Sequence, residues 1–345
     1  MPTGGWRRLA PVAATLALAA AGGLAAAGVG LPAPALLGSM LAVAAAALLR
    51  ARVRVPGRLR DPAFAVIGCS LGSAITPDFL TDAARWPLSL ALLCGMLAAL
   101  IVGSSWLLAR AFGIDRASAI LATSPGALSY SLALTVSGVG DARVVATIQS
   151  LRLLAITLML PLILDVAGAR GTFWGEVAPA EMEMARALAV WAGAVALGWV
   201  GGRLGLPAAY LLAGMAVSGG THAAGLVAGQ FPLPLLTLGF VITGAVVGAR
   251  FAGIARRDLR ALAWAALSVV GFASALSAGF AALTAWLLAI PFGQAWVAYA
   301  PGGVEAMAAM ALALGYDPTF VATHHVFRIV LLILTLPLFL RWLAR

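Results

Sequence analysis

Long apolar runs separated by short polar connections make up most of this chain. Such runs predict membrane-spanning helices, because roughly 20 apolar residues cross a bilayer core of about 30 Å. The predicted spans are residues 9–29, 33–49, 62–76, 87–109, 143–165, 186–204, 207–226, 232–250, 262–289 and 318–340. The segment 62–76 is short for a span, so a tilted or half-buried helix is an alternative there. We therefore expect an all-α fold, a polytopic transmembrane helical bundle of about ten spans.

The first apolar run admits two interpretations. Arg7 and Arg8 precede it and small residues follow near its end, which is also the pattern of a cleavable signal peptide. However, residues 31–40 resemble residues 206–215, and a comparable apolar run precedes each of them. Because the second copy lies inside the chain, we expect the first run to be retained as a membrane span.

Forty residues of the chain recur. Shifted by 176 positions without a gap, residues 125–164 align with residues 301–340, and thirteen of the forty pairs are identical. The identities include Pro125-Gly126, Asp141, Thr147, Arg152 and Pro161, which align with Pro301-Gly302, Asp317, Thr323, Arg328 and Pro337. The pattern indicates an internal duplication. It predicts a first membrane repeat at 1–166, an extramembrane linker at 167–185 and a second repeat at 186–345.

The composition agrees with a membrane protein and places the charges between the spans. Hydrophobic residues form 63% of the chain and charged residues 10%, which is too little polar surface to cover a soluble globule of this size. The formal net charge is +10 and every basic residue other than histidine is arginine. Most arginines stand in short clusters between apolar runs rather than on one face, so we expect no nucleic-acid partner.

The arginine clusters predict that the two repeats are inverted. The loop after the second span carries Arg50, Arg52, Arg54, Arg58 and Arg60 in the first repeat, whereas residues 221–223 of the second repeat are uncharged. The next loop carries Asp78, Asp82 and Arg85 in the first repeat, but Arg250, Arg256, Arg257 and Arg260 in the second. Because arginine-rich short loops face the cytoplasm, equivalent loops of the two repeats are expected on opposite sides.

Each repeat contains one apolar segment that proline and glycine interrupt. Inversion needs an odd number of crossings per repeat, yet each repeat has six apolar segments. The interrupted segments, residues 117–140 and 294–315, contain the helix breakers Pro125-Gly126 and Pro301-Gly302-Gly303, so we expect them to be broken or re-entrant. This choice places both termini in the cytoplasm and the linker outside. The alternative is that the broken helix crosses fully and the segment near Gly68 does not.

Ionisable residues inside the predicted spans mark a candidate polar site. Arg152 and Arg328 lie near the middle of equivalent spans, and a mid-membrane arginine is expected to be paired or to bind an anion. Broken helices at equivalent positions of inverted repeats are typical of secondary transporters, whose helix ends bind substrate near the midplane. The predicted substrate-binding residues are Pro125, Gly126, Ser129, Tyr130, Arg152, Pro301, Gly302, Gly303, Glu305 and Arg328. The predicted coupling or ion-pair residues are Asp141, Asp317 and His324, because Asp317, His324 and Arg328 share one helical face.

A structural interpretation of the same residues stays open. Arg328 and Glu305 could form an ion pair that only holds two helices in register. The adjacent His324 and His325, without further ligands, would make a poor metal site, and His222 is expected to be solvated. We therefore expect no metal, no cofactor and no catalytic residue.

These features together resemble the bacterial AbrB-family membrane proteins. The resemblance covers roughly residues 10–340 and rests on the duplicated architecture, the segments 124–129 and 300–307, and the helices 141–161 and 317–337. It implies a layout similar to inverted-repeat cation-antiporter and anion-transporter carriers. The family carries two conflicting labels, regulator of gene expression and ammonia monooxygenase, and the resemblance transfers no binding residues.

Three functions remain to be distinguished. Ammonia oxidation needs a copper or iron centre with several histidine or carboxylate ligands, and three histidines in the chain do not provide one. An enzyme of another kind lacks a nucleophile and base pair. We expect a secondary transporter of a small anionic or zwitterionic solute in the inner (plasma) membrane, with the lipid bilayer and the solute as partners and a homodimer as a plausible assembly. The second hypothesis is a membrane sensor or regulator that influences gene expression indirectly, without binding DNA.

Overall fold

The computed structural model describes residues 4–73, 86–125, 128–136, 138–169, 171 and 180–343, with only the backbone described at 4–9, 128, 129, 133, 136 and 343. Fourteen helices account for nearly all regular structure in these ranges, beside one bridge between Glu181 and Gln230. They are α1 (Gly4–Gly28), α2 (Pro34–Leu48), α3 (Gly57–Gly72), α5 (Trp86–Phe112), α6 (Arg116–Thr123), α7 (Leu128–Val136), α8 (Ala142–Val166), α9 (Met184–Arg203), α10 (Ala209–Ala223), α11 (Leu233–Ala249), α12 (Arg256–Leu288), α13 (Phe292–Tyr299), α14 (Val304–Leu314) and α15 (Pro318–Leu343). The all-α prediction is confirmed.

Six described helices are long and apolar enough to cross a membrane, judged by length and composition. They are α1 (from Ala10), α5, α8, α9, α12 and α15 (to Trp342). The other four predicted spans correspond to α2, α3, α10 and α11, which have only 15, 16, 15 and 17 residues. These four helices are shorter than the roughly 20 residues that a straight crossing needs.

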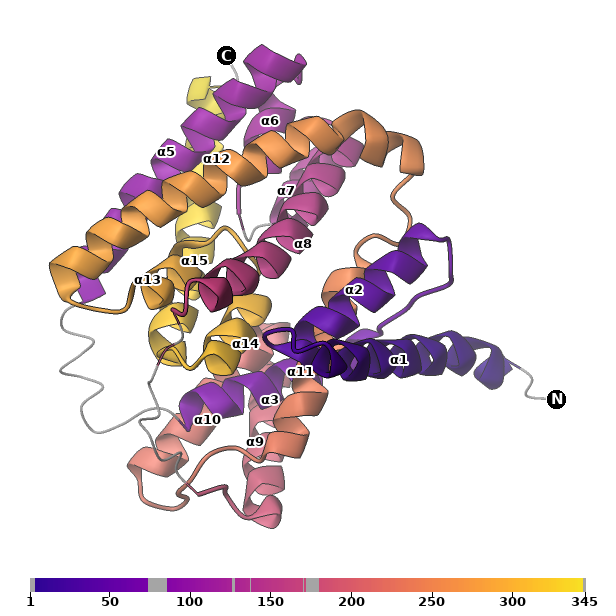
Figure 1. Ribbon diagram of the computed structural model, residues 1–345, viewed down its shortest axis with the longest axis vertical. Helices are drawn as coiled ribbons and strands as arrows, with labels where there is room; N and C mark the ends of the chain where they lie inside the picture. The colour runs from indigo at the N-terminus through magenta and orange to yellow at the C-terminus, as the bar shows by residue number, and fades with distance from the viewer. Residues whose placement is uncertain are drawn as a thin grey trace. The chain divides into compact units, whose positions relative to one another are not determined.

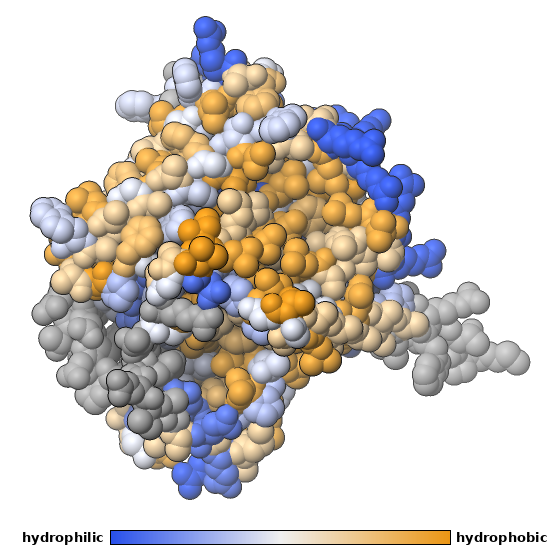
Figure 2. Space-filling model, in the orientation of Figure 1, coloured by the Kyte–Doolittle hydropathy of each residue, from blue (hydrophilic) through white to orange (hydrophobic). Residues whose placement is uncertain are grey.

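The surface agrees with this membrane-like character. Large apolar side chains are exposed on the long helices, including Trp106 on α5, Trp264 and Trp286 on α12, and Trp342 on α15. Figure 2 shows a face dominated by hydrophobic residues, with the hydrophilic ones gathered in separate patches. Exposed apolar area on this scale is expected where lipid replaces water as the solvent.

The chain forms two compact units, and each takes segments from both sides of the predicted linker. Unit 1 comprises Met1–Leu80, Pro161–Gly253 and Ala308–Phe320. Unit 2 comprises Thr81–Leu160, Ile254–Met307 and Val321–Arg345. The candidate site residues from Pro125 to Arg152 and from Pro301 to Glu305, together with His324 and Arg328, belong to unit 2.

Glycines set the helix packing inside unit 1. Gly68 and Gly72 place α3 against α10, and a Cβ atom added at Gly72 would lie 2.7 Å from the backbone nitrogen of Gly219. Gly244 and Gly248 do the same for α11 against α2, where a Cβ atom at Gly248 would lie 2.6 Å from the carbonyl oxygen of Met40. The two glycines of each pair are four residues apart, a spacing that lets helices approach closely, and each pair joins a helix of the first half to one of the second.

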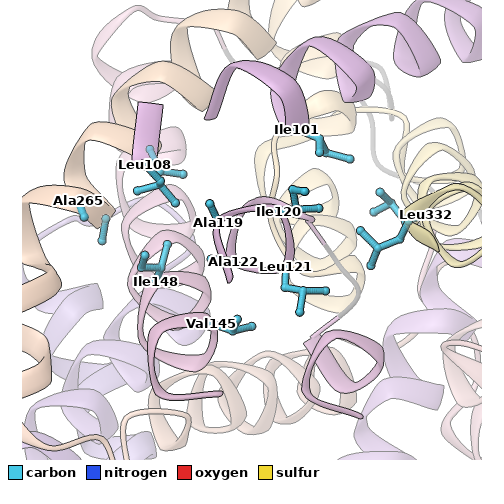
Figure 3. Packing of buried hydrophobic residues seen from close by; sticks show 13 residues of the cluster. Ile101, Leu108, Ala119, Ile120, Leu121, Ala122, Val145, Ile148, Ala265 and Leu332 are labelled. Atoms are coloured by element: carbon cyan, nitrogen blue, oxygen red, sulfur yellow. The ribbon is translucent and has the colours of Figure 1, made fainter. Parts of the chain in front are cut away.

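Unit 2 is built around the short helix α6. Ala119, Ile120, Leu121 and Ala122 of α6 are fully buried and belong to one apolar cluster with residues of α5, α8, α12 and α15. Figure 3 shows α6 inside this cluster, with Ile148 of α8 and Leu332 of α15 among the side chains around it. In Figure 1, α12 runs beside α5, with which it is in contact, and leads into the second short helix, α13. Both broken segments therefore start from a helix held inside unit 2.

Candidate functional site

Both predicted helix breaks are present at the two prolines. Helix α6 ends at Thr123, followed by Ser124 and Pro125, and α7 begins at Leu128. Helix α13 ends at Tyr299, followed by Ala300 and Pro301, and α14 begins at Val304. Proline has no N–H, so the carbonyl four residues earlier loses its helical hydrogen bond. The breaks therefore orphan the carbonyls of Leu121 and Val297.

Two side chains at equivalent positions satisfy these orphaned carbonyls. The Nε2 amide of Gln149 on α8 donates to the Leu121 carbonyl at 2.7 Å. On α15, His325 Nε2 donates to the Val297 carbonyl at 2.9 Å. Because the acceptor is a carbonyl, Nε2 of His325 must carry the hydrogen. Gln149 and His325 are 176 positions apart, the same separation as the two prolines.

Two arginines cap the remaining carbonyls at the same breaks. Arg152 donates from Nη1 to the carbonyls of Ala122 (3.0 Å) and Thr123 (2.8 Å), and from Nη2 to that of Ser124 (3.3 Å). Arg328 donates from Nη1 to the Ala300 carbonyl (2.7 Å) and from Nη2 to the Gly302 carbonyl (2.6 Å). Each positive charge thus lies at the C-terminal, negative end of a helix dipole.

Among the described residues, no acidic side chain is paired with either arginine. Arg152 is 3% exposed and Arg328 is fully buried. Within the part of the chain that the structure describes, both guanidinium groups donate to backbone carbonyls, and the Nε atom of each has no hydrogen-bond partner. Removing a guanidinium from water costs several kcal/mol, and neutral carbonyls offset only part of that cost. The arrangement leaves positive charge and unused donors in a buried place.

The two breaks converge within unit 2. A Cβ atom added at Gly303 would lie 3.4 Å from Leu153 of α8, so the second break packs beside the residue that follows Arg152. The guanidinium groups of Arg152 and Arg328 are close enough for their charges to interact. The two central arginines and the second Pro-Gly segment therefore lie close together within unit 2.

The other predicted binding residues divide into three groups. Pro125, Pro301 and Gly302 are buried at the breaks, and Gly303 is half-buried. Glu305 is half-buried in the first turn of α14, and the ion pair with Arg328, which was the alternative interpretation, is not formed among the described residues. Gly126 lies outside the described residues, as does the side chain of Ser129.

Tyr130 and the two aspartates have local structural contacts. Tyr130 is partly buried against the apolar cluster around α6. Asp141 and Asp317 cap the next helices: Oδ1 of Asp141 accepts from the Arg143 amide at 2.7 Å, and Oδ1 of Asp317 accepts from the amides of Thr319 and Phe320. The Arg143 amide, more than its guanidinium, lowers the pKa of Asp141. Neither aspartate contacts the arginine site through these bonds.

His324 belongs to a second buried polar group in unit 2. Its Nε2 lies 2.7 Å from Ser89 Oγ on α5, and Ser89 Oγ donates to the Trp86 carbonyl. Tyr299, the last residue of α13, donates its hydroxyl to the Ser89 carbonyl at 2.6 Å and accepts from Thr284 of α12. These bonds tie α15, α5, α13 and α12 together around the second break.

Sequence analysis missed the roles of Gln149 and His325. The signal that could have found them is the proline itself, since it identifies the orphaned carbonyl and hence the need for a donor from a neighbouring helix. The described residues contain no group of three or more histidine, cysteine, aspartate or glutamate side chains that could hold a metal ion. The chemistry that the site offers is therefore hydrogen bonding and positive charge.

Comparison with known proteins identifies the family. The sequence model of the AbrB family, described as transition state regulatory protein AbrB, matches residues 35–344. The chain is 28% identical over 322 residues to an Escherichia coli (strain K12) protein named "Putative regulator AbrB", with 91% of each chain covered. It is 24% identical over 310 residues to "Uncharacterized protein YhjN" of Bacillus subtilis (strain 168), covering 81% of this chain and 77% of that one. A family match over nearly its whole length places this chain in the AbrB family.

Proposed function

We propose that the protein is a secondary transporter that moves a small anionic or zwitterionic solute by alternating access. One observation carries the proposal: among the described residues, the two buried arginines at the helix breaks have no acidic partner, and the Nε atom of each has no hydrogen-bond partner. A buried cation that is left unneutralised is unfavourable in a protein built only for stability. An anion bound between the guanidinium groups would remove that cost.

The geometry of the guanidinium groups favours a carboxylate-like or similarly forked anion. Among the described residues both arginines donate through Nη atoms alone, so the Nε hydrogen remains for a ligand. Nε and one Nη hydrogen form the side edge that binds carboxylate and related oxyanions in a bidentate manner. Glu305 in the first turn of α14 would be available to an ammonium group, which is why a zwitterion also fits.

The repeated contacts support a duplicated and inverted architecture. At the first break Gln149 and Arg152 donate to the freed carbonyls, and at the second break His325 and Arg328 do so. The two pairs are separated by the same 176 positions. Paired broken helices in inverted repeats are the layout by which carriers expose one central site to either side of the membrane in turn. In this proposal the lipid bilayer is the cell's inner membrane, both termini are cytoplasmic, and a homodimer is the assembly.

A membrane regulator is the second candidate, and the relatives' names favour it. The family description contains the word regulatory, and the name of the Escherichia coli relative contains the word regulator. In this role the same anion site would sense a solute and signal through a partner protein, without DNA binding and without catalysis. A solute-dependent change in gene expression with no flux would favour the sensor over the carrier.

Flux measurements on arginine variants test the carrier. Comparison of metabolites inside and outside a deletion strain and its parent identifies candidate solutes for reconstituted vesicles. Arg152→Gln and Arg328→Gln should each abolish flux while the protein still inserts into the membrane. Arg143→Gln, an exposed arginine on the same helix as Arg152, is the matched control and should transport normally. Wild-type flux in both buried variants would reject the anion site.

A further inference from the structure

The two helix breaks differ in the side chain that donates to the orphaned carbonyl. Gln149 and His325 both donate an N–H to the carbonyl that a proline orphans. A glutamine amide does not take up a proton near neutral pH, whereas an imidazole does. The second break is therefore titratable at a position where the first is not.

One nitrogen of His325 is free to receive that proton. The ring is fully buried, Nε2–H is engaged with the Val297 carbonyl, and Nδ1 has no hydrogen-bond partner within the described part of the chain. Protonation at Nδ1 would leave the Nε2 hydrogen bond intact, because Nε2 keeps its hydrogen in both forms. The second break can thus change its charge without losing the bond that holds it.

Because of the charges around His325, binding of a proton to Nδ1 depends on the presence of an anion. On its own helix its titratable neighbours are His324 and Arg328, and α13, which it contacts, contributes only Tyr299. Arg152 of α8 adds a second positive charge close to Arg328, and Glu305 of α14 is not bonded to either arginine among the described residues. Burial away from water opposes a positive charge on this ring, and the charge of Arg328 opposes it further in the empty site, whereas a bound anion would favour it.

We propose that His325 Nδ1 is a proton-binding site that fills together with an anion at Arg328, so that the protein binds a proton and an anion as a pair. The inference rests on the proposed anion site and deepens it by naming the coupling ion. The proton adds to the Nδ1 lone pair and forms an imidazolium, and no other bond forms or breaks. Linkage requires that each ligand raises the affinity for the other by the same factor.

A first experiment tests the coupling without any solute. The chain has three histidines, so labelling histidine rings with ¹⁵N gives three sets of signals in nanodiscs, and His325→Gln identifies the one from His325. The fraction of His325 carrying two ring protons at pH 6 should rise several-fold in Arg328→Gln. It should not change in Arg143→Gln, which removes an exposed arginine. An unchanged fraction in Arg328→Gln would overturn the inference.

A second experiment measures binding of ³⁵S-labelled sulfate to the purified protein between pH 5.5 and 8. Sulfate stays a dianion over this range, so any pH dependence comes from the protein. The affinity of the wild type for sulfate should fall about tenfold for each unit by which the pH rises, over the range in which one proton is taken up with the anion. His325→Gln, which copies Gln149, should bind with an affinity that does not change with pH.

The outcomes separate the two proposals. Sulfate binding by His325→Gln with the wild-type pH dependence would overturn the proton site and leave the anion site standing. Sulfate binding that persists in the double variant Arg152→Gln/Arg328→Gln, or that is absent from the wild type, would overturn the anion site. The labelling experiment still decides the role of His325 in that case, because it needs no anion. If His325→Gln does not fold, the variants His222→Gln and His324→Gln identify the signals of the other two histidines, and the remaining signal belongs to His325.

Discussion

The two helix breaks share their supports and differ in what surrounds them. In both, a glutamine or histidine satisfies the carbonyl four residues before the proline, and an arginine three positions further along caps the helix end. The first break pairs Gln149 with an arginine that contacts three carbonyls, whereas the second pairs His325 with an arginine that contacts two. The shared features follow from the backbone break itself. The differences identify the second break as the one that can respond to protons.

The largest expected effect comes from removing the arginines. Arg152→Met leaves three buried carbonyls without their donor and Arg328→Met leaves two. At about 1–3 kcal/mol for each unsatisfied group, partly offset by relief of the buried charge, each variant should lose roughly 2–4 kcal/mol of unfolding free energy. Arg152→Met should be the less stable of the two. Denaturant titration in detergent measures both, and equal stability to the wild type would show that the carbonyls are satisfied in another way.

Removing the donor to the orphaned carbonyl should have a smaller effect. Gln149→Ala and His325→Ala should each lose about 1–3 kcal/mol, because each leaves one buried carbonyl unpaired. The comparison is sharpened by a double-mutant cycle with Pro301→Ala, which restores an N–H that can reach the Val297 carbonyl. In that background His325→Ala should cost about 1 kcal/mol less than in the wild type. Strict additivity would mean that His325 does not compensate for the proline.

Replacing each arginine by lysine tests whether the forked guanidinium group is needed at each break. Lysine keeps the charge but cannot hold two carbonyls in a planar fork. Arg152→Lys and Arg328→Lys should therefore fold at a cost of about 1 kcal/mol, with partial loss of flux. The readouts are melting temperature and vesicle flux. Full activity in either variant would show that charge alone suffices there.

The aspartates that begin α8 and α15 should show the smallest difference. Asp317 accepts two backbone amides and Asp141 accepts one beside an exposed pair with Arg143. Asp141→Ala should cost below about 1 kcal/mol at pH 7, and Asp317→Ala somewhat more. Because the pKa of Asp141 is lowered in the folded protein, its contribution is present at neutral pH and disappears as the pH falls through that lowered value. A melting-temperature difference between Asp141→Ala and wild type that does not shrink as the pH falls through and below the ordinary aspartate range would contradict this assignment.

The sequence predicted the helical class and the two breaks because these depend on local rules. Long apolar runs, helix-breaking Pro-Gly pairs and mid-span arginines are each visible in a single segment. The partners of the arginines were not predictable in the same way. Glu305 is an obvious partner by charge, yet the carbonyls of Ala300 and Gly302 take that place because the break turns them toward Arg328. The helices α2, α3, α10 and α11 are also shorter than a straight membrane crossing needs. Their apolar composition predicted spans but does not determine how long a helix is.

The glycine contacts of unit 1 have a consequence for biosynthesis. Helix α3 packs through Gly68 and Gly72 on α10, and α2 receives Gly244 and Gly248 of α11. Both partners emerge from the ribosome only after the whole first half has been synthesised. The early helices must therefore wait in the bilayer with their small-residue grooves uncovered, so a truncated product that ends before residue 209 would present those grooves to quality-control proteases.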